Sequence, residues 1–307
     1  MKLPMKKFPM KTKFAVIGLA VTWLTLPGVQ PQAQAGTWST LVNPAPDNLE
    51  HVLLLSDGTV LAAQYQQTIA SNWYRLVPDS FGSYLNGTWT NIAPMHYTRM
   101  FFSSTVLKDG RVFVAGGEFG TGGATAEVYN PQNNTWTVVS PPASVLDPTK
   151  ISPSNGHTQS IADAECKVLP SGQVLICPIN PKLINGTLLY DPVANSWTSG
   201  PPTLHLVDEA SAVKLADGSI LTVDPDKSSS ERYLPALNVW TNDASTSPAY
   251  LWDSLSPFVG EQGPAFLLPD GKRVKPILRS CAVSAGRCPS GCCKGPHRAR
   301  HLPASSI

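Results

Sequence analysis

The stretch VLKDGRVFVAGGEFGTGGATAEVYNPQNNTWTVV, residues 106–139, decides the fold. Two apolar runs flank the turn dipeptide Asp109-Gly110, a Gly-Gly pair follows, and Tyr129 and Trp136 mark two further runs. Asp-Gly between β-rich runs favours a tight hairpin, because glycine adopts positive φ without a Cβ clash. The stretch therefore predicts four short antiparallel strands joined by turns.

The hairpin part of this stretch recurs along the chain. Each copy places an apolar run, a turn glycine and a second apolar run in the same order, and the turn glycines are Gly58, Gly110, Gly172, Gly218 and Gly271. After three of the turns, a tyrosine and then a tryptophan follow in the same order. Four-stranded units that recur at roughly 50 residues are typical of β-propeller blades.

Residues 106–139 closely resemble a Kelch repeat, because the Gly-Gly pair, the tyrosine and the tryptophan stand in Kelch order. The resemblance covers about 38–271. Two copies depart from it, with Pro178 and Ile179 or Asp224 and Pro225 in place of the glycines. The resemblance implies an all-β fold, a Kelch-type β-propeller of four-stranded antiparallel blades with about four to five blades present. The expected propeller resembles the Kelch-type propeller of galactose and glyoxal oxidases.

Two basic ends flank an acidic body. Residues 1–35 hold five lysines and no acid, and residues 272–307 hold eight Lys or Arg and no acid. The body, 36–271, has 10 basic and 21 acidic residues and a net charge of −11. Nucleic acid is therefore excluded as a partner of the body, because phosphate binding needs a cationic face. We divide the chain into a segment 1–35, a propeller 36–271 and a basic cysteine-containing tail 272–307.

The segment 1–35 has the pattern of a secretory signal peptide. Five lysines precede an apolar run of 13 residues, 14–26, and Ala33-Gln34-Ala35 supplies a small-x-small cleavage pattern. A membrane anchor needs about 20 apolar residues, so we expect cleavage after Ala35 and no membrane span in the mature chain. The expected location is extracellular or periplasmic.

The tail 272–307 does not continue the repeat. Pro276 falls within the next expected strand, where it removes a ladder donor. Three interpretations stay open: a disordered or frameshifted end that truncates a longer propeller, a basic tail for anionic polymers, or a small metal or disulfide module. The module would use four cysteines whose spacing differs from the C-x2-C pairs of zinc sites: Cys281, Cys288, Cys292 and Cys293.

Two cysteines of the body flank the turn at Ser171-Gly172. If these two residues form a two-residue loop, Cys166 and Cys177 face each other across the hairpin, with Cα atoms about 5.5 Å apart. That separation suits a disulfide, which export permits. A cross-strand disulfide and two buried free thiols are the alternatives.

Candidate binding residues fall into two groups. Acids and a histidine precede the turn glycines by about seven to ten residues, at the expected mouth of the central channel: Glu50, His51, Asp163, Glu165, Asp208, Glu209 and Glu261. Such carboxylates either hold a hard cation such as Ca²⁺ or simply solvate strand ends. The long insert of the first blade carries aromatic residues that could stack on sugar rings: Trp73, Tyr74, Phe81 and Tyr84.

The pattern favours a secreted binding scaffold for a carbohydrate or protein ligand, a hypothesis that rests on analogy of fold. The resemblance to the oxidases implies an alternative, a copper-radical carbohydrate or aldehyde oxidase, whose copper is held by two Tyr and two His. None of His51, His96, His157 and His205 stands in a recognisable copper motif. We therefore assign no catalytic residue and expect no cofactor, with Ca²⁺ or copper unsupported by a motif. The third alternative is a non-functional truncated fragment.

Overall fold

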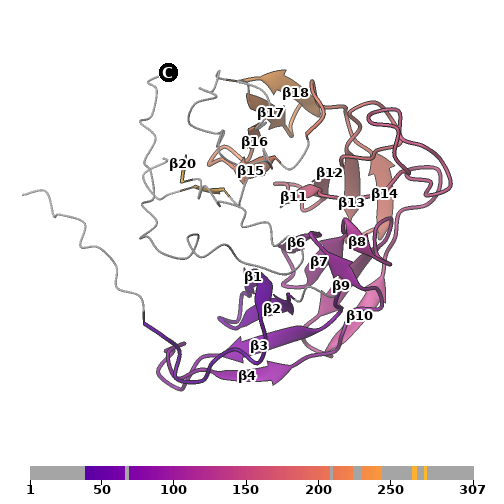
Figure 1. Ribbon diagram of the computed structural model, residues 1–307. Helices are drawn as coiled ribbons and strands as arrows, with labels where there is room; N and C mark the ends of the chain where they lie inside the picture. Colours follow the sequence, from indigo (N-terminus) through magenta and orange to yellow (C-terminus); the bar gives the residue numbers. More distant parts are fainter. Residues whose placement is uncertain are drawn as a thin grey trace, which may run out of the picture. The chain divides into compact units, whose positions relative to one another are not determined.

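The computed structural model describes residues 39–65, 69–207, 210–223, 230–243, 265–267 and 273–274 (Figure 1). The chain divides into two compact units, Met1–Ser39 and Thr40–Ile307. All the described strands belong to the second unit, and within the described ranges the regular structure is β-strand without helix. Accordingly, none of the described segments forms a helix that could cross a membrane.

Four antiparallel sheets of four strands each follow one another along the chain, which confirms the all-β prediction and the four-stranded blades (Figure 1). The first two sheets consist of β1 (Leu49–Leu54), β2 (Val60–Gln64), β3 (Trp73–Val77) and β4 (Thr88–Asn91), and of β6 (Ser103–Val106), β7 (Val112–Ala115), β9 (Ala126–Asn130) and β10 (Thr135–Val138). The other two consist of β11 (Glu165–Val168), β12 (Val174–Cys177), β13 (Leu188–Asp191) and β14 (Ser196–Ser199), and of β15 (Ser211–Lys214), β16 (Ile220–Val223), β17 (Ser230–Leu234) and β18 (Val239–Asn242).

Two smaller ribbons accompany these sheets. The strand β5 (Arg99–Met100) pairs with β8 (Phe119–Gly120) beside the second sheet. The strand β19 (Phe266–Leu267) pairs with β20 (Arg273–Val274), and β19 contacts β15 of the fourth sheet. The last ribbon is the described part of the fifth hairpin that the repeat predicts.

The turn between the first two strands of each sheet contains three residues rather than two. In the third sheet, the Leu169 amide donates to the Gln173 carbonyl, and the Gly172 amide donates to the Leu169 carbonyl. Gly172 has φ +101°, the left-handed conformation that glycine tolerates best. The same bonds recur around Gly58, Gly110 and Gly218, so the repeat specifies one turn four times.

The extra turn residue changes the register of the third sheet, and the disulfide prediction is wrong. Cys166 pairs with Ile176, and Cys177 pairs with Glu165. Because neighbouring residues on a strand point to opposite faces, the two thiols lie on opposite faces of the sheet. Both cysteines are buried and free. Burial raises the pKa of the Cys166 thiol to about 11, and it also raises the pKa of Cys177.

A tyrosine–asparagine bond fixes the turn between the last two strands in three of the sheets. The Tyr190 hydroxyl donates to Oδ1 of Asn195 at 3.0 Å, and Asn195 has φ 47°. Tyr129 with Asn134 and Tyr233 with Asn238 make the same bond at 2.9 and 2.8 Å. The tyrosine of the repeat is therefore a turn anchor, and asparagine supplies the left-handed residue that the turn needs.

Successive sheets pack face to face and form three apolar joints. We call the face of a sheet that packs on the preceding sheet its leading face, and the opposite face its trailing face. In the second sheet, Val112, Val114 and Trp136 lie on the leading face, in a cluster with Leu61 and Trp73 of the first sheet. The trailing face contributes Phe113, Ala115 and Val128 to the next cluster, whose members from the third sheet are Val174, Ile176 and Tyr190.

Tryptophan side chains bond across the first two joints. The Trp136 indole donates from Nε1 to the Ala93 carbonyl at 2.7 Å, and the Trp197 indole donates to the Val139 carbonyl. The corresponding nitrogens of Trp89 and Trp240 are buried without a hydrogen-bond partner. The repeated tryptophan therefore forms a hydrogen bond across a joint only where a backbone carbonyl lies within reach of its Nε1.

Candidate functional site

The connections between strands gather at two ends of the sheets. At the turn end, Lys108 donates from Nζ to the Pro170 carbonyl, and a Cβ on Gly218 would lie 2.6 Å from Pro170, so turns of neighbouring sheets adjoin. At the opposite end, the connections from the second to the third strand meet those that lead from one sheet to the next. We call this second end the loop end.

Arg99 organises the loop end of the second sheet. Its side chain is 0% exposed, and Nη1 donates to the carbonyls of Gly116, Gly122 and Thr125 at 2.6, 2.8 and 3.0 Å. The guanidinium also pairs with Glu127 at 3.1 Å, so its charge is compensated inside the fold. One side chain therefore holds the glycine-rich loop 116–125 in a single conformation.

Two glycines of this loop are required by close approach. A Cβ on Gly116 would lie 1.6 Å from the Ile161 carbonyl oxygen, and a Cβ on Gly122 would lie 2.5 Å from Nη1 of Arg99. Gly116 also has φ +75°. Gly116 of the repeat's Gly-Gly pair thus lets the loop lie against the neighbouring connection, and Gly122 lets it lie against Arg99. Both contacts support the interpretation of this stretch as a blade loop.

Glu127 joins this network to the preceding connection. Its carboxylate is 0% exposed and accepts from the His96 amide at 2.8 Å, from the Tyr97 amide at 3.3 Å and from Nδ1 of His96 at 2.7 Å. Glu231 of the fourth sheet holds His205 in the same way, at 2.8 Å. Both histidines therefore serve to position connections at the loop end.

An exposed pair of phenylalanines lies on this framework. Phe101 follows β5 directly and Phe119 begins β8; they are 46% and 44% exposed, and their ring centroids are 6.2 Å apart in an edge-to-face arrangement. Phe101 has φ 54°, which is rare for a bulky residue and costs on the order of 1 kcal/mol. The pairing of β5 with β8 brings the two rings together, although they contribute little to the core.

The pair belongs to a wider group of exposed apolar side chains at the loop end. Eight large apolar residues that are at least 37% exposed lie on these connections: Tyr65, Ile69, Phe101, Phe119, Ile151, Leu183, Ile184 and Leu204. Connections rather than strands carry most binding residues in proteins, because a rigid scaffold presents them. The group is therefore the best candidate for a binding surface in the described structure.

Among the described residues, those expected at the channel mouth do not form one cluster. Glu50 and His51 lie in a bulge of β1, where burial raises the pKa of Glu50 to about 7 and lowers the pKa of His51 to about 4. The His51 ring stacks on Phe102 at 4.1 Å, and its Nδ1 lies 3.2 Å from the Ser104 hydroxyl. These contacts place His51 between the first and second sheets.

The other predicted acids have separate surroundings. Glu165 pairs with Lys167 at 2.9 Å. Asp163 has φ 43°. It lies nine residues before its turn glycine, as Phe101 does in the second sheet. Asp208, Glu209 and Glu261 lie outside the described residues. Within the described ranges, no three His, Cys, Asp or Glu side chains gather as a metal site would require.

The donor set of a copper oxidase does not fit the described residues. His96 and His205 are each bound to a buried glutamate, and His51 is stacked on Phe102. The resemblance implies two histidines and two tyrosines around one point, and three of the four described histidines are engaged apart from one another in these contacts. No catalytic step is derived through copper for this chain.

The predicted aromatic residues of the first insert have three different environments. Trp73 and Tyr74 belong to β3 and are 0% and 8% exposed, so their prediction as exposed sugar-stacking residues is wrong. Trp73 packs in the first joint, 5.7 Å from Trp136 between ring centroids. Phe81 is 94% exposed, whereas the Tyr84 hydroxyl donates to the Gly58 carbonyl at 2.7 Å and anchors the insert at the turn end.

Sequence reasoning missed Phe119 as a candidate binding residue. Phe119 stands inside GGEFGTGG, a stretch that reads as a blade loop because glycines surround it. The signal that could have identified Phe119 was a bulky apolar residue in a loop that otherwise consists mostly of glycine. The spacing to the turn glycine places Phe101 at the channel entrance, but nothing in the sequence pairs it with Phe119.

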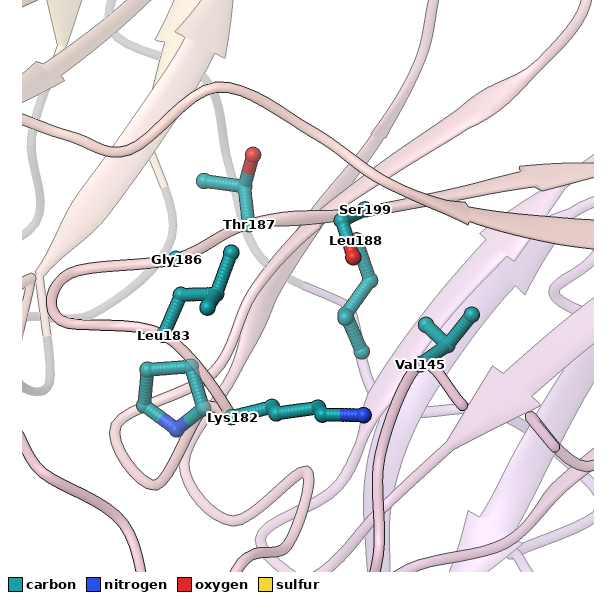
Figure 2. A pocket seen from close by; sticks show the side chains of 8 residues that line it. Val145, Lys182, Leu183, Gly186, Thr187, Leu188 and Ser199 are labelled. Atoms are coloured by element: carbon teal, nitrogen blue, oxygen red, sulfur yellow. The ribbon is translucent and has the colours of Figure 1, made fainter. Parts of the chain in front are cut away.

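A shallow depression of about 170 Å³ lies at the loop end of the third sheet (Figure 2). Val145, Leu183, Leu188 and Ser199 line it together with Lys182 (Figure 2). Lys182 donates from Nζ to the carbonyls of Ala143 and Ser144 at 3.3 and 2.6 Å, so its charge stabilises a connection. The depression is too small and too well packed to enclose a drug-sized ligand.

Comparisons with known proteins agree with this architecture. The Kelch motif family matches residues 99–143, which hold Arg99, the Gly-Gly pair, Tyr129 and Trp136. No curated protein sequence matches the chain.

Solved structures that are similar to the chain include YjhT and a fungal alcohol oxidase. The structure of YjhT aligns with a TM-score of 0.50 at 15% identity, over 71% of this chain and 68% of that chain. A fungal alcohol oxidase of the AA5 family in complex with copper aligns with a TM-score of 0.39 at 17% identity. That alignment covers 73% of this chain and 57% of the oxidase, so this chain spans little more than half of the oxidase's length.

Proposed function

This chain is built from the blades of a Kelch-type β-propeller, and from that premise we propose that it is a binding scaffold for a protein ligand. The surface we propose for the ligand is the loop end, centred on Phe101 and Phe119. A rigid set of sheets that presents variable connections suits recognition rather than bond-making chemistry. The proposal rests on the site and not on the fold alone, because one fold hosts many functions.

One observation supports this proposal most strongly. Eight exposed large apolar side chains gather on the connections of one end, and two of them form an edge-to-face pair on a framework held by Arg99. Of the eight, Phe101 and Phe119 are in contact, and exposed apolar surface of this kind marks interaction sites in soluble proteins. Exposed phenylalanines supported by a buried ion pair are suited to fill a pocket of a partner.

The composition of the surface favours a protein over a carbohydrate. Five of the eight side chains are aliphatic, namely Ile69, Ile151, Leu183, Ile184 and Leu204. Aliphatic groups offer no π face for stacking on a sugar ring, whereas they pack well against apolar side chains. The aromatic residues that suggest sugar stacking from the sequence, Trp73 and Tyr74, are buried.

A binding selection with matched variants tests the proposal. Peptides selected from a random displayed library against the full chain serve as the probe, and a glycan array is screened in parallel. We expect the double variant Phe101→Ala, Phe119→Ala to bind the selected peptides at least about tenfold more weakly, because both rings lose buried contact area. Phe81→Ala is the control, since Phe81 is 94% exposed on the insert at the turn end.

Two results would contradict the proposal. Equal peptide binding by the double variant and the original chain would remove the loop end as the site. Binding to glycans, without selection of any peptide, would replace the protein ligand by a carbohydrate. Circular dichroism of each variant shows that a loss of binding does not come from loss of fold.

We further propose that the ligand lies outside the cytoplasm, because the N-terminal pattern predicts export with cleavage after Ala35. The mass of the secreted product tests this directly. A mature chain that begins at Gly36 is the expected result. A cell-associated product that retains Met1 would contradict it.

A further inference from the structure

Among the residues that the structure describes, no sheet packs on the leading face of the first sheet. Val52 and Leu54 on β1 are 63% and 64% exposed. At the position of Val52, six residues before the turn glycine, the third and fourth sheets have Cys166 and Ala212, which are each 4% exposed. In those sheets the preceding sheet covers this position. The first sheet therefore presents large apolar side chains on a surface that is buried elsewhere in the same molecule.

An unpaired indole lies on the same leading face. Trp89 pairs with Leu76 in the first sheet, just as Trp136 pairs with Tyr129 in the second. The Trp136 indole donates to a carbonyl of the preceding sheet, but Nε1 of Trp89 is buried and has no partner. A buried donor without an acceptor is destabilising, so this face is incomplete in polar contacts as well as in apolar ones.

A complementary surface lies at the other end of the described strands. Phe266 on β19 is 57% exposed and stands five residues before Gly271. The corresponding residue of the first sheet, Leu53, packs in the first joint from the trailing side. Phe266 therefore lies on the trailing face of the last ribbon, where the leading face of another sheet could pack on it. Because Phe266 and Leu54 are both exposed in one molecule, they do not cover each other within it.

We propose that these two surfaces form a fourth joint between two copies of this chain, in a head-to-tail arrangement. Phe266 of one copy packs on Val52 and Leu54 of the next, and the incoming chain supplies an acceptor for the Trp89 indole. The second copy is the occupant because the chain itself holds both halves of the joint. It also joins its sheets in this trailing-to-leading manner three times over. Such an arrangement is heterologous, so it builds rings or open assemblies rather than an isologous dimer.

A mixing experiment tests this arrangement. The full chain is studied by sedimentation velocity over a concentration series, with a reductant present so that the tail cysteines do not link copies. We expect concentration-dependent assembly of the original chain. Leu54→Lys removes the leading half and Phe266→Lys the trailing half, so each variant alone should associate at least about tenfold more weakly.

The mixture of the two variants gives the decisive result. Each variant keeps one intact half, so Phe266 of the Leu54→Lys chain can still dock on Leu54 of the Phe266→Lys chain. We expect a one-to-one dimer in the mixture and monomers in each variant alone. Val193→Lys is the control, because Val193 is 93% exposed at the turn end and should leave assembly unchanged.

Three outcomes would overturn the proposal. They are a monomeric original chain throughout the concentration series, assembly that persists in both single variants, and a mixture that stays monomeric while the original chain assembles. Leu54 and Phe266 are more than half exposed, so lysine at either position is compatible with the fold. Urea unfolding of each variant confirms that the fold is intact.

Discussion

At the scale of single residues, Arg99 has the largest structural role at the loop end. It satisfies three carbonyls and neutralises Glu127, and both side chains are 0% exposed. Replacing Arg99 by alanine leaves a buried carboxylate and a loop without its donors. We expect Arg99→Ala to lower the free energy of unfolding by about 3–5 kcal/mol, as measured by urea denaturation.

Arg111→Ala is the matched control for Arg99→Ala. Arg111 pairs with Asp109 at 2.7 Å, but the two side chains are 31% and 48% exposed. Exposed ion pairs contribute little, so the expected loss is below about 1 kcal/mol. Similar losses for the two variants would show that the buried pair has no special part in holding the loop.

Glu50 gives the fold a dependence on pH. Burial raises the pKa of Glu50 to about 7, from 4.5 for the free side chain. The stabilisation that comes from the protonated carboxyl is therefore complete below pH 4.5 and is lost as the pH rises through 7. Glu50→Gln removes the charged form, so we expect the variant to be more stable than the original chain at pH 8 and equally stable at pH 4.5.

Urea unfolding at both pH values measures this difference for Glu50→Gln. The exposed Gln132 provides the control, since it has no ionisable group and Gln132→Ala should show the same stability relative to the original chain at both pH values. His51 acts in the opposite sense, because burial lowers its pKa to about 4 and it loses stabilisation as the pH falls from 6.5. If the Glu50→Gln variant is less stable than the original chain at pH 8, burial of the charged Glu50 carboxylate does not destabilise the fold, and the prediction is wrong.

At the scale of elements, the three-residue turn explains both what the sequence predicts and what it does not. The dipeptide ending in Gly172 correctly marks a hairpin, and the repeat correctly predicts four strands for each sheet. The dipeptide does not specify whether the loop has two residues or three, because glycine serves both turns. One residue of difference moves Cys166 and Cys177 to opposite faces, so a pairing counted outward from the turn fails.

Strand ends that the sequence does not mark also explain why the exposure of the aromatic residues is predicted incorrectly. Trp73 and Tyr74 lie in a strand whose start the sequence does not mark, so they resemble residues of a long insert. Phe101 and Phe119 come together only because β5 pairs with β8, and each of these strands has two residues. Strands this short carry too little alternation to be predicted from sequence.

The tryptophan of each sheet allows a direct test of the joints. Trp136 and Trp240 occupy the same position, and they are 6% and 7% exposed. The Trp136 indole donates to Ala93, whereas Nε1 of Trp240 has no partner. We expect Trp136→Phe to reduce the free energy of unfolding by about 1–2 kcal/mol more than Trp240→Phe, because only the first change leaves a carbonyl unsatisfied.

Urea denaturation of the two phenylalanine variants measures the difference. The loss of ring volume is the same in both, so it cancels in the comparison. Equal losses would mean that the bond from Trp136 to Ala93 contributes nothing to the joint. A larger loss for Trp240→Phe would assign the stability of the joints to packing alone.

At the scale of the whole molecule, each sheet depends on its neighbours, as in a repeat protein whose units contact only adjacent units. Among the described residues, the joint between the second and third sheets holds sixteen buried residues, and the joint between the third and fourth holds ten. The unpaired indole of Trp240 lies in the smaller cluster. We therefore expect the joint to the fourth sheet to open before the joint between the second and third sheets under native conditions.

The two buried thiols report on these two joints separately. Cys166 lies in the larger cluster and Cys177 in the smaller one, and burial raises the pKa of both, so each reacts only when its joint opens. Alkylation followed by peptide mass spectrometry should modify Cys177 before Cys166. Equal rates would show that the described sheets open as one unit. Faster modification of Cys166 would contradict the order of stability, because the joint with more buried apolar surface would then be the weaker one.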